Sequence, residues 1–131
     1  MSRAKDMRVA EALNYAIWVR DNVSDMKDHD VTKAVIELGD YKVFSSRQIS
    51  AIISNRVSHT TVSSTIGKKD KTGGNLNVAS LEVLRNILYS RSSGKTNYGL
   101  IAKALEEGTS QGMISKLTGV SQSSISRRFN G

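Results

Sequence analysis

The 131-residue sequence contains no cysteine and no proline, and its aromatic residues are one tryptophan, four tyrosines and two phenylalanines. Without cysteine, disulfide bonds and thiolate metal sites are excluded. No apolar run approaches the ~20 residues that a membrane-spanning helix needs, and the residues after Met1 do not form a signal-peptide pattern. We therefore expect a soluble, cytoplasmic protein with no membrane partner.

Acidic residues are scarce after residue 40. Residues 1–40 contain six Lys or Arg and eight Asp or Glu, whereas residues 41–131 contain thirteen bases and four acids. The two parts therefore carry net charges of −2 and +9, which give the +7 of the whole chain. This asymmetry favours a polyanion-binding part next to a supporting part. A basic protein without a polyanionic partner is the alternative.

Helical periodicity dominates the sequence. Residues 3–22 have the apolar spacing of an amphipathic helix, and Trp18 is expected in the core or in helix packing. A second helix is expected to start at an Asp30 cap and to stop at Leu38, with Gly39 at the C′ position. We predict an all-α fold of about eight helices, the others spanning residues 45–54, 58–66, 79–89, 97–107, 110–117 and 121–129.

The stretch "SRSSGKTN" (residues 90–97) is rich in Ser and Gly, a composition typical of linkers. We therefore predict an N-terminal helical domain over residues 1–90, a linker over residues 91–97 and a small C-terminal helical domain over residues 98–131. A basic loop, "KKDKTGGNLN", is expected over residues 68–77.

Two short helices that cross at a steep angle and share a tight turn can place the second helix in a DNA major groove. The first helix needs an apolar residue followed by a small one, because the second helix crosses close to that point. The turn needs a residue that tolerates a positive φ angle, usually glycine, and then an apolar plug. The second helix needs a buried apolar residue and an otherwise polar face. Two segments of the sequence meet these requirements.

The clearer segment is "QGMISKLTGVSQSSISRRFNG" at the end of the chain. It supplies the apolar–small pair (Ile114 and Ser115), the turn glycine (Gly119) and the apolar plug (Val120). Its second helix has an N-cap serine (Ser121) and two apolar positions spaced for burial (Ile125 and Phe129).

This segment resembles the helix-turn-helix of the lambda-repressor and Cro family over about 21 residues. The longer stretch "LIAKALEEGTSQGMISKLTGVSQSSISRRF" is also similar to the DNA-binding tails of serine recombinases. Arg128 departs from the repressor family, which usually has an apolar residue there. We interpret Arg128 as a boundary residue whose guanidinium reaches a phosphate. The resemblance predicts a helix-turn-helix over about residues 110–130.

The other segment is "SSRQISAIISNRVSHTTVSSTIGKK" (residues 45–69). It predicts a helix-turn-helix over about residues 45–67, with a turn, "SNR", about one residue longer than the family pattern. The following "NLNVASLEVLRNIL" resembles the helix after the recognition helix in the same family. An ordinary helical hairpin with a polar, solvated face is the alternative. The expected roles fall on Ile49 with Ser50 (apolar–small pair), Val57 (plug), Ser58 (N-cap), Val62 and Ile66 (buried), Gly67 (helix end), and Leu81, Leu84, Ile87 and Leu88 (core of the following helix).

The resemblance implies base contacts from the first turns of each second helix. Gln pairs with adenine and Arg with guanine through two hydrogen bonds, and Ser or Thr with either. The histidine in the first segment is equally consistent with a plain polar residue at a helix start. The implied base-contacting residues are Ser58, His59, Thr60, Thr61, Ser63 and Ser64 in the first segment, and Ser121, Gln122, Ser123, Ser126 and Arg127 in the second. The implied phosphate contacts are Arg47, Gln48, Arg56, Lys68, Lys69, Lys71, Gln111, Lys116 and Arg128.

Sites of other kinds find little support. "SGKT" (residues 93–96) lacks the preceding glycine and strand of a phosphate-binding loop. "DMKDHD" (residues 25–30) lacks the glycine and glutamate of a calcium loop, and an acidic turn before the next helix is the simpler interpretation. We expect no catalytic residues, no metal and no cofactor.

The resemblance implies a transcriptional repressor of phage or mobile-element type, acting in lysogeny in the bacterial cytoplasm or nucleoid. Its partner is double-stranded DNA, which two different units in one chain would read as an asymmetric site. The N-terminal helices would then brace the first unit, form a homodimer or bind a protein partner. The alternatives are a DNA-binding accessory protein or module of a recombinase, terminase or partition complex, and a helical module that binds protein.

Overall fold

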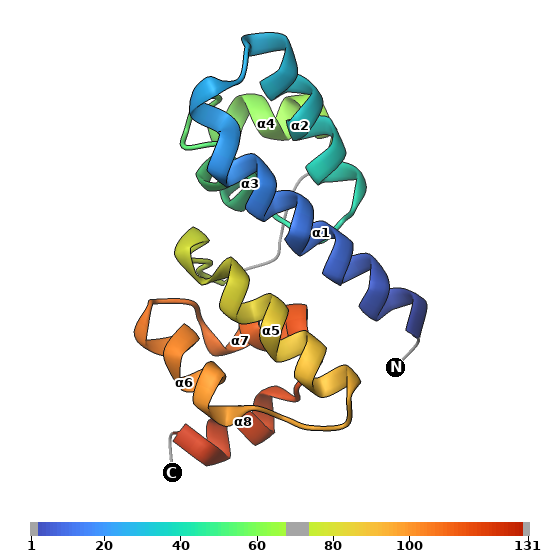
Figure 1. Ribbon diagram of the computed structural model, residues 1–131. Helices are drawn as coiled ribbons and strands as arrows, with labels where there is room; N and C mark the ends of the chain where they lie inside the picture. The colour runs from blue at the N-terminus through green and yellow to red at the C-terminus, as the bar shows by residue number, and fades with distance from the viewer. Residues whose placement is uncertain (1–2, 68–73, 130–131) are drawn as a thin grey trace. The chain divides into compact units, whose positions relative to one another are not determined.

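The computed structural model describes residues 3–67 and 74–129 (Figure 1). Within these ranges the chain is all-α, as predicted, and contains no strand. Two short 3-10 turns, Val23–Asp25 and Val78–Ser80, accompany the helices. The helices are α1 (Arg3–Asn22), α2 (Asp28–Asp40), α3 (Ser46–Ile52), α4 (His59–Ile66), α5 (Leu81–Ser92), α6 (Tyr98–Glu106), α7 (Gln111–Thr118) and α8 (Gln122–Phe129).

Polar side chains cap the starts of most of the short helices. The bounds of these helices therefore agree closely with the bounds predicted from the sequence. The side chains of Ser45, Ser58, Asn97 and Ser110 each accept a backbone N–H from the first turn of α3, α4, α6 and α7, respectively. Each satisfies a donor that has no partner inside its helix. Gly67 ends α4 at a φ of 66°, the left-handed conformation that glycine adopts without strain.

The start and end of α2 differ from the prediction. The helix begins at Asp28, after an N-cap residue, Lys27, whose side chain makes no capping hydrogen bond. Gly39 lies inside the helix instead of ending it. A Cβ on Gly39 would lie 2.6 Å from Cγ2 of Ile66 in α4, so this glycine allows the two helices to approach closely. The left-handed residue follows later, at Lys42 with a φ of 58°.

Two aromatic residues that were expected to be buried are exposed. Trp18 is 53% exposed, because the buried side of α1 is formed by residues such as Ala12, Ala16 and Val19, which place position 18 on the other side of the helix. Its ring instead stacks on Tyr15, with 6.2 Å between centroids. Phe129 is 37% exposed at the end of α8.

Tyr15 also joins α1 to α2. Burial raises the pKa of Tyr15 above its ordinary value, and a hydrogen bond with Glu37 and the negative charge of that carboxylate raise it further. The hydroxyl therefore stays protonated at neutral pH.

The chain forms two compact units, which also differ from the predicted domains. The N-terminal unit is Asn14–Thr72, and the C-terminal unit is Gly73–Gly131 together with Met1–Leu13. The predicted boundary at residues 91–97 falls inside the C-terminal unit, because α5 packs against both α6 and α7. Residues 91–97 therefore join two helices of one unit, and α5 belongs with the helices that follow it.

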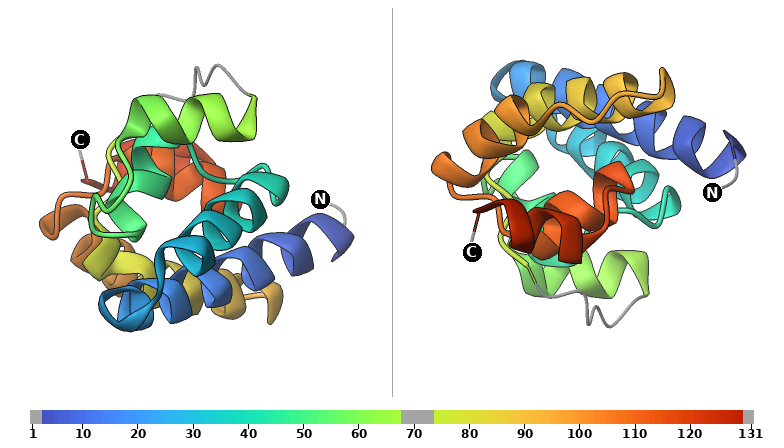
Figure 2. Two further views of the ribbon diagram at one scale, coloured as in Figure 1. Left: turned by 90° about the horizontal axis from the view of Figure 1, so that it is seen from above. Right: turned by 90° about the horizontal axis from the view of Figure 1, so that it is seen from below.

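Each unit has its own apolar core. In the C-terminal unit, the four positions predicted as the buried side of α5 are all buried, together with Ile101, Met113, Ile114 and Ile125. In the N-terminal unit, the core includes Leu38, Ile49, Ile52, Ile53 and Val62. These residues hold α3 against α4 in the N-terminal unit and α7 against α8 in the C-terminal unit. Figure 2 shows the same helices in two further views.

Candidate nucleic-acid interface

Each compact unit contains one pair of short helices joined by a turn. We call α3 with α4 the first helical pair and α7 with α8 the second helical pair (Figure 1). They coincide with the two segments that the sequence singled out.

The turn of the second helical pair is built as predicted. Gly119 has a φ of 79°, and the following Val120 is buried. Thr118 adds a contact that sequence reasoning missed. Its buried hydroxyl donates to the carbonyl of Ile114 (2.6 Å) and accepts the N–H of Val120 (3.3 Å). Val120 and the fully buried Ile125 then anchor α8 on α7.

The turn of the first helical pair is longer than that of the second, and the spacing between the two caps is longer by two residues. Ser58 follows the cap Ser45 by 13 positions, whereas Ser121 follows the cap Ser110 by 11. The extra length is accommodated by two consecutive left-handed residues, at φ angles of 55° and 59°.

Ser50 fixes this longer turn. It is the small residue of the predicted apolar–small pair, and it is buried. Its hydroxyl donates to the carbonyl of Val57 (2.8 Å), and its own carbonyl accepts the N–H of Asn55 (2.8 Å). Val57 itself is only half-buried, so it fills the predicted plug position less completely than Val120 does.

The second helices of the two pairs begin in the same way. Ser58 Oγ accepts the N–H of Thr61 (3.3 Å) and lies 3.1 Å from the Thr61 hydroxyl. Ser121 Oγ accepts the N–H of Ser124 (3.1 Å) and lies 2.7 Å from the Ser124 hydroxyl. Both α4 and α8 therefore start with a serine cap that is paired with a hydroxyl three residues later.

The predicted base-contacting residues lie on the accessible sides of α4 and α8. Neither helix contains Asp or Glu, so the charge they present is positive or neutral. Some hydroxyls are also used within the helices: Ser64, for example, donates to the carbonyl of Thr60 (3.2 Å). Exposed are Ser58, His59, Thr60, Thr61, Ser64, Ser121, Gln122, Ser123 and Arg127, while Ser63 and Ser126 are half-buried.

Two predicted phosphate contacts instead make hydrogen bonds within the protein. Gln48 is buried, and its side-chain oxygen accepts the N–H of Ser45 (2.9 Å) in a capping box at the start of α3. The guanidinium of Arg56 donates to the carbonyls of Val23 (2.7 Å) and Met26 and to Asp28 Oδ1 (2.8 Å). Gln48 therefore starts a helix and Arg56 holds a turn, and these hydrogen bonds already use the polar groups that were expected to contact phosphate.

The other phosphate candidates have different surroundings. Arg47 and Lys116 are exposed, and Gln111 is half-buried. Arg128 is exposed, and its guanidinium carbon lies 4.9 Å from the centroid of the Tyr98 ring, in cation–π contact. Lys68, Lys69 and Lys71 lie outside the described residues.

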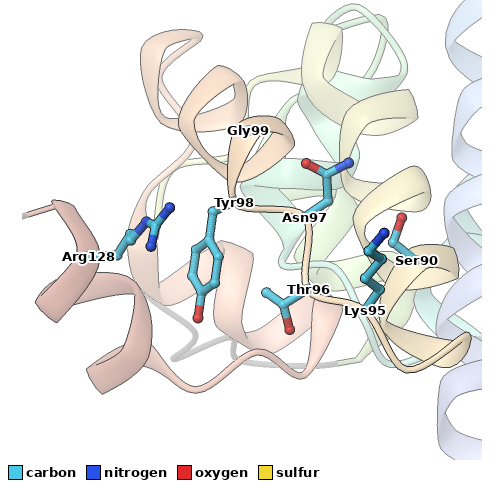
Figure 3. A pocket seen from close by; sticks show the side chains of 7 residues that line it. All are labelled: Ser90, Lys95, Thr96, Asn97, Tyr98, Gly99 and Arg128. Atoms are coloured by element: carbon cyan, nitrogen blue, oxygen red, sulfur yellow. The ribbon is translucent and has the colours of Figure 1, made fainter.

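Sequence reasoning missed a polar pocket near Arg128. The pocket has a volume of about 380 Å³, and Lys95, Thr96 and Tyr98 contribute to its lining (Figure 3). These residues were treated as a linker or as the start of a helix. The signals that mark an ordered connection were present, since Gly94 suits a helix end and Asn97 suits a helix start.

Other kinds of site have little support among residues 3–67 and 74–129. These residues include no group of three or more His, Cys, Asp or Glu that could hold a metal. In the first turn of α2, where an acidic turn before the helix was expected, Asp28 pairs with Arg56, and His29 Nε2 lies 3.1 Å from Asp30 Oδ1. Within the same ranges, no helix has both the length and the apolar character needed to cross a bilayer.

Comparisons with family models, with curated proteins and with solved structures each gave no match for the chain. Any functional assignment therefore depends on the residues and on their arrangement. The two helical pairs, with their serine caps and acid-free second helices, are the features that such an assignment has to explain.

Proposed function

We propose that the protein is a sequence-specific double-stranded DNA-binding transcriptional repressor of phage or mobile-element type. In this proposal α4 and α8 are the recognition helices of two helix-turn-helix units. The observation that carries it is the shared design of these helices: each starts at a serine cap, is held by a buried apolar residue, and has a polar surface without carboxylates. A major groove accepts such a helix.

The two recognition helices would read different bases. On α8, Gln122 offers a bidentate partner for adenine, and Arg127 one for guanine. On α4, the exposed His59, Thr60 and Thr61 offer hydrogen bonds and a methyl contact for thymine. Because the two sets differ, one chain that used both helices would bind an asymmetric site, without the palindrome that a symmetric dimer requires.

Charge favours a polyanionic partner. The C-terminal unit, which contains the second helical pair, has ten Lys or Arg and five Asp or Glu, a net charge of +5. Seven of the nine predicted phosphate contacts remain once Gln48 and Arg56 are removed. For six to ten phosphate contacts, affinity is expected to fall by roughly 10³–10⁵ between 50 and 200 mM salt.

The repressor role depends on the family resemblance in the sequence, whereas DNA binding also depends on the geometry. A DNA-binding accessory protein of a recombinase, terminase or partition complex would use the same surface. The two roles differ in the position of the bound sites. Binding at promoters supports the repressor, and binding only at recombination or packaging sequences supports the accessory role.

Base readout is tested by replacing both Gln122 and Arg127 with alanine. We expect this double variant to lose affinity for a selected duplex by roughly 5- to 150-fold per residue, because each bidentate contact contributes ~1–3 kcal/mol of discrimination. Affinity for a mixed-sequence duplex should fall much less. Fluorescence anisotropy with both duplexes, at one salt concentration, measures the two losses.

The matched control is Lys103→Gln, which removes an exposed charge from α6 outside the recognition helix. Its effect on both duplexes should be small and equal. If the Gln122→Ala, Arg127→Ala double variant also lost affinity equally for both duplexes, base readout by α8 would be wrong. If the native protein bound neither duplex, the proposed function itself would be wrong.

A further inference from the structure

The connection between α5 and α6 is fixed by hydrogen bonds at both ends. At the end of α5, the N–H of Gly94 donates to the carbonyl of Arg91 (2.9 Å), and the N–H of Lys95 donates to the carbonyl of Ser90 (3.0 Å). Gly94 has a φ of 89°, so this is a Schellman motif. At the start of α6, the side chain of Asn97 accepts the N–H of Leu100 (3.1 Å). Lys95 and Thr96 are therefore held at defined positions.

These positions open onto the pocket near Arg128. Its lining includes two cationic side chains, Lys95 and Arg128, and three side chains with a hydroxyl, Ser90, Thr96 and Tyr98, but no Asp or Glu. Figure 3 shows Lys95 beside Ser90 at one end, and the Tyr98 ring between Thr96 and Arg128 at the other. Two cations with nearby hydroxyl donors and no carboxylate suit a bound anion.

The volume of the pocket admits a ligand larger than an inorganic phosphate ion. A volume of about 380 Å³ is within the range of ~300–1,000 Å³ that admits small organic ligands. It leaves room for a sugar attached to the phosphate. The guanidinium of Arg128 is oriented by its contact with the Tyr98 ring, so its planar donors are positioned before a ligand arrives.

The pocket is also continuous with the surface of α8. A second, shallower pocket of about 300 Å³ shares Tyr98 and Arg128 with it and extends to Ser124 and Arg127. Arg127 is one of the predicted base-contacting residues. A polyanion lying along α8 would therefore pass from Arg127 to the pocket without leaving the protein surface.

We propose that this pocket binds a phosphorylated ligand, with Lys95 and the neighbouring Ser90 holding a phosphate group at one end and Arg128 supplying a second cationic contact at the other end. Under the proposed function, on which this assignment rests in part, the ligand is a backbone phosphate beside the bases that α8 reads. A free phosphorylated small molecule has the same chemistry, and the experiment separates the two sources.

The DNA source is tested with Lys95→Gln, which removes one cation from an exposed position. We expect the slope of log affinity against log salt to become shallower by about 0.9, the value for one lost phosphate contact. Replacing backbone phosphates one at a time with neutral methylphosphonates should reveal a position that weakens binding by the native protein and has no effect on Lys95→Gln. Lys103→Gln should show the native response at that position, and unfolding midpoints check that both variants are folded.

The free source is tested by titrating inorganic phosphate into the full chain and following the backbone amide NMR signals of Lys95, Thr96 and Gly99. Saturable shifts that Lys95→Gln abolishes, in a protein that binds no DNA, would support the pocket with a free phosphorylated ligand and reject the proposed function. DNA binding in which neutralising one phosphate weakens the native protein but not Lys95→Gln would support both the pocket assignment and the proposed function. Native-like behaviour of Lys95→Gln in both the DNA and the phosphate experiments would overturn the pocket assignment.

Discussion

Gly39 shows how a single residue sets the distance between two helices. Inside a helix, alanine is normally favoured over glycine by ~0.8–1.0 kcal/mol. At this position, however, the added Cβ would lie 2.6 Å from Cγ2 and 3.1 Å from Cβ of Ile66, both of which belong to the packed side of α4. The packing penalty should therefore exceed the gain in helix propensity.

We predict that Gly39→Ala lowers the free energy of unfolding by about 1–3 kcal/mol, the usual effect of inserting a methyl group into packed structure. Gly112 in α7 is the matched control, because a Cβ there would meet only Gln122 Oε1, at 3.9 Å. Gly112→Ala should leave stability unchanged or raise it by up to ~1 kcal/mol. Denaturant unfolding measures both, and equal effects of the two substitutions would refute the close contact with Ile66.

Residues whose role is local were the ones predicted from the sequence. Gly119 was identified as a turn residue and Ser121 as a cap because both roles depend on neighbours within a few positions. The roles of Gly39 and Arg56 depend on atoms about 27–33 positions away in the chain. No local pattern marks such contacts, which is why Gly39 was interpreted as a helix end and Arg56 as a phosphate contact.

At the scale of elements, Arg56 links the turn of the first helical pair to the segment between α1 and α2. Its guanidinium donates to two carbonyls, from Val23 and Met26, and pairs with Asp28. The side chain is 28% exposed, whereas that of Asp28 is fully exposed, so the carbonyls contribute most of the stabilisation.

We predict that Arg56→Gln lowers the free energy of unfolding by about 1–3 kcal/mol, the range for hydrogen bonds to a charged group. It should leave the salt dependence of DNA binding close to native. Arg47→Gln, at an exposed position on α3, should do the reverse, with little effect on stability and a slope shallower by about 0.9. Thermal unfolding and salt titrations on the two variants check this, and a large slope change for Arg56→Gln would restore its original interpretation as a phosphate contact.

Helix bounds were predicted to within one or two residues wherever a side chain caps the helix. The starts of α4, α6, α7 and α8 follow Ser58, Asn97, Ser110 and Ser121, as expected. The start of α2 was misplaced because no side chain caps it. Trp18 was expected in the core or in helix packing because the periodicity of α1 alone did not show that position 18 faces away from the buried side.

At the scale of the whole molecule, the division into units was the least predictable feature. A run of Ser and Gly at residues 90–97 indicated a linker, but this run forms a Schellman motif and leads into a capped helix inside the C-terminal unit. The boundary could not be read locally, because it follows from the packing of α5 on α6 and α7. The polar pocket near Arg128, which sequence reasoning also missed, is lined by residues of α5, of the connection between α5 and α6, of the start of α6 and of α8.

The two helical pairs belong to different compact units and carry different polar residues on their second helices. The central functional claim is that both pairs read DNA bases within one chain. It predicts a bound sequence that is longer than a single helix covers and that lacks two-fold symmetry.

The most direct test is the selection of bound duplexes from a random DNA library, followed by sequencing. We predict an enriched asymmetric motif longer than about one helical turn, or ~10 base pairs. One half of this motif should lose its base preference when Gln122 and Arg127 are both replaced by alanine. The other half should lose its base preference when His59 and Thr60 are both replaced by alanine. A palindromic motif read by one helix would contradict the use of both pairs, and the absence of any enriched motif would contradict sequence-specific DNA binding altogether.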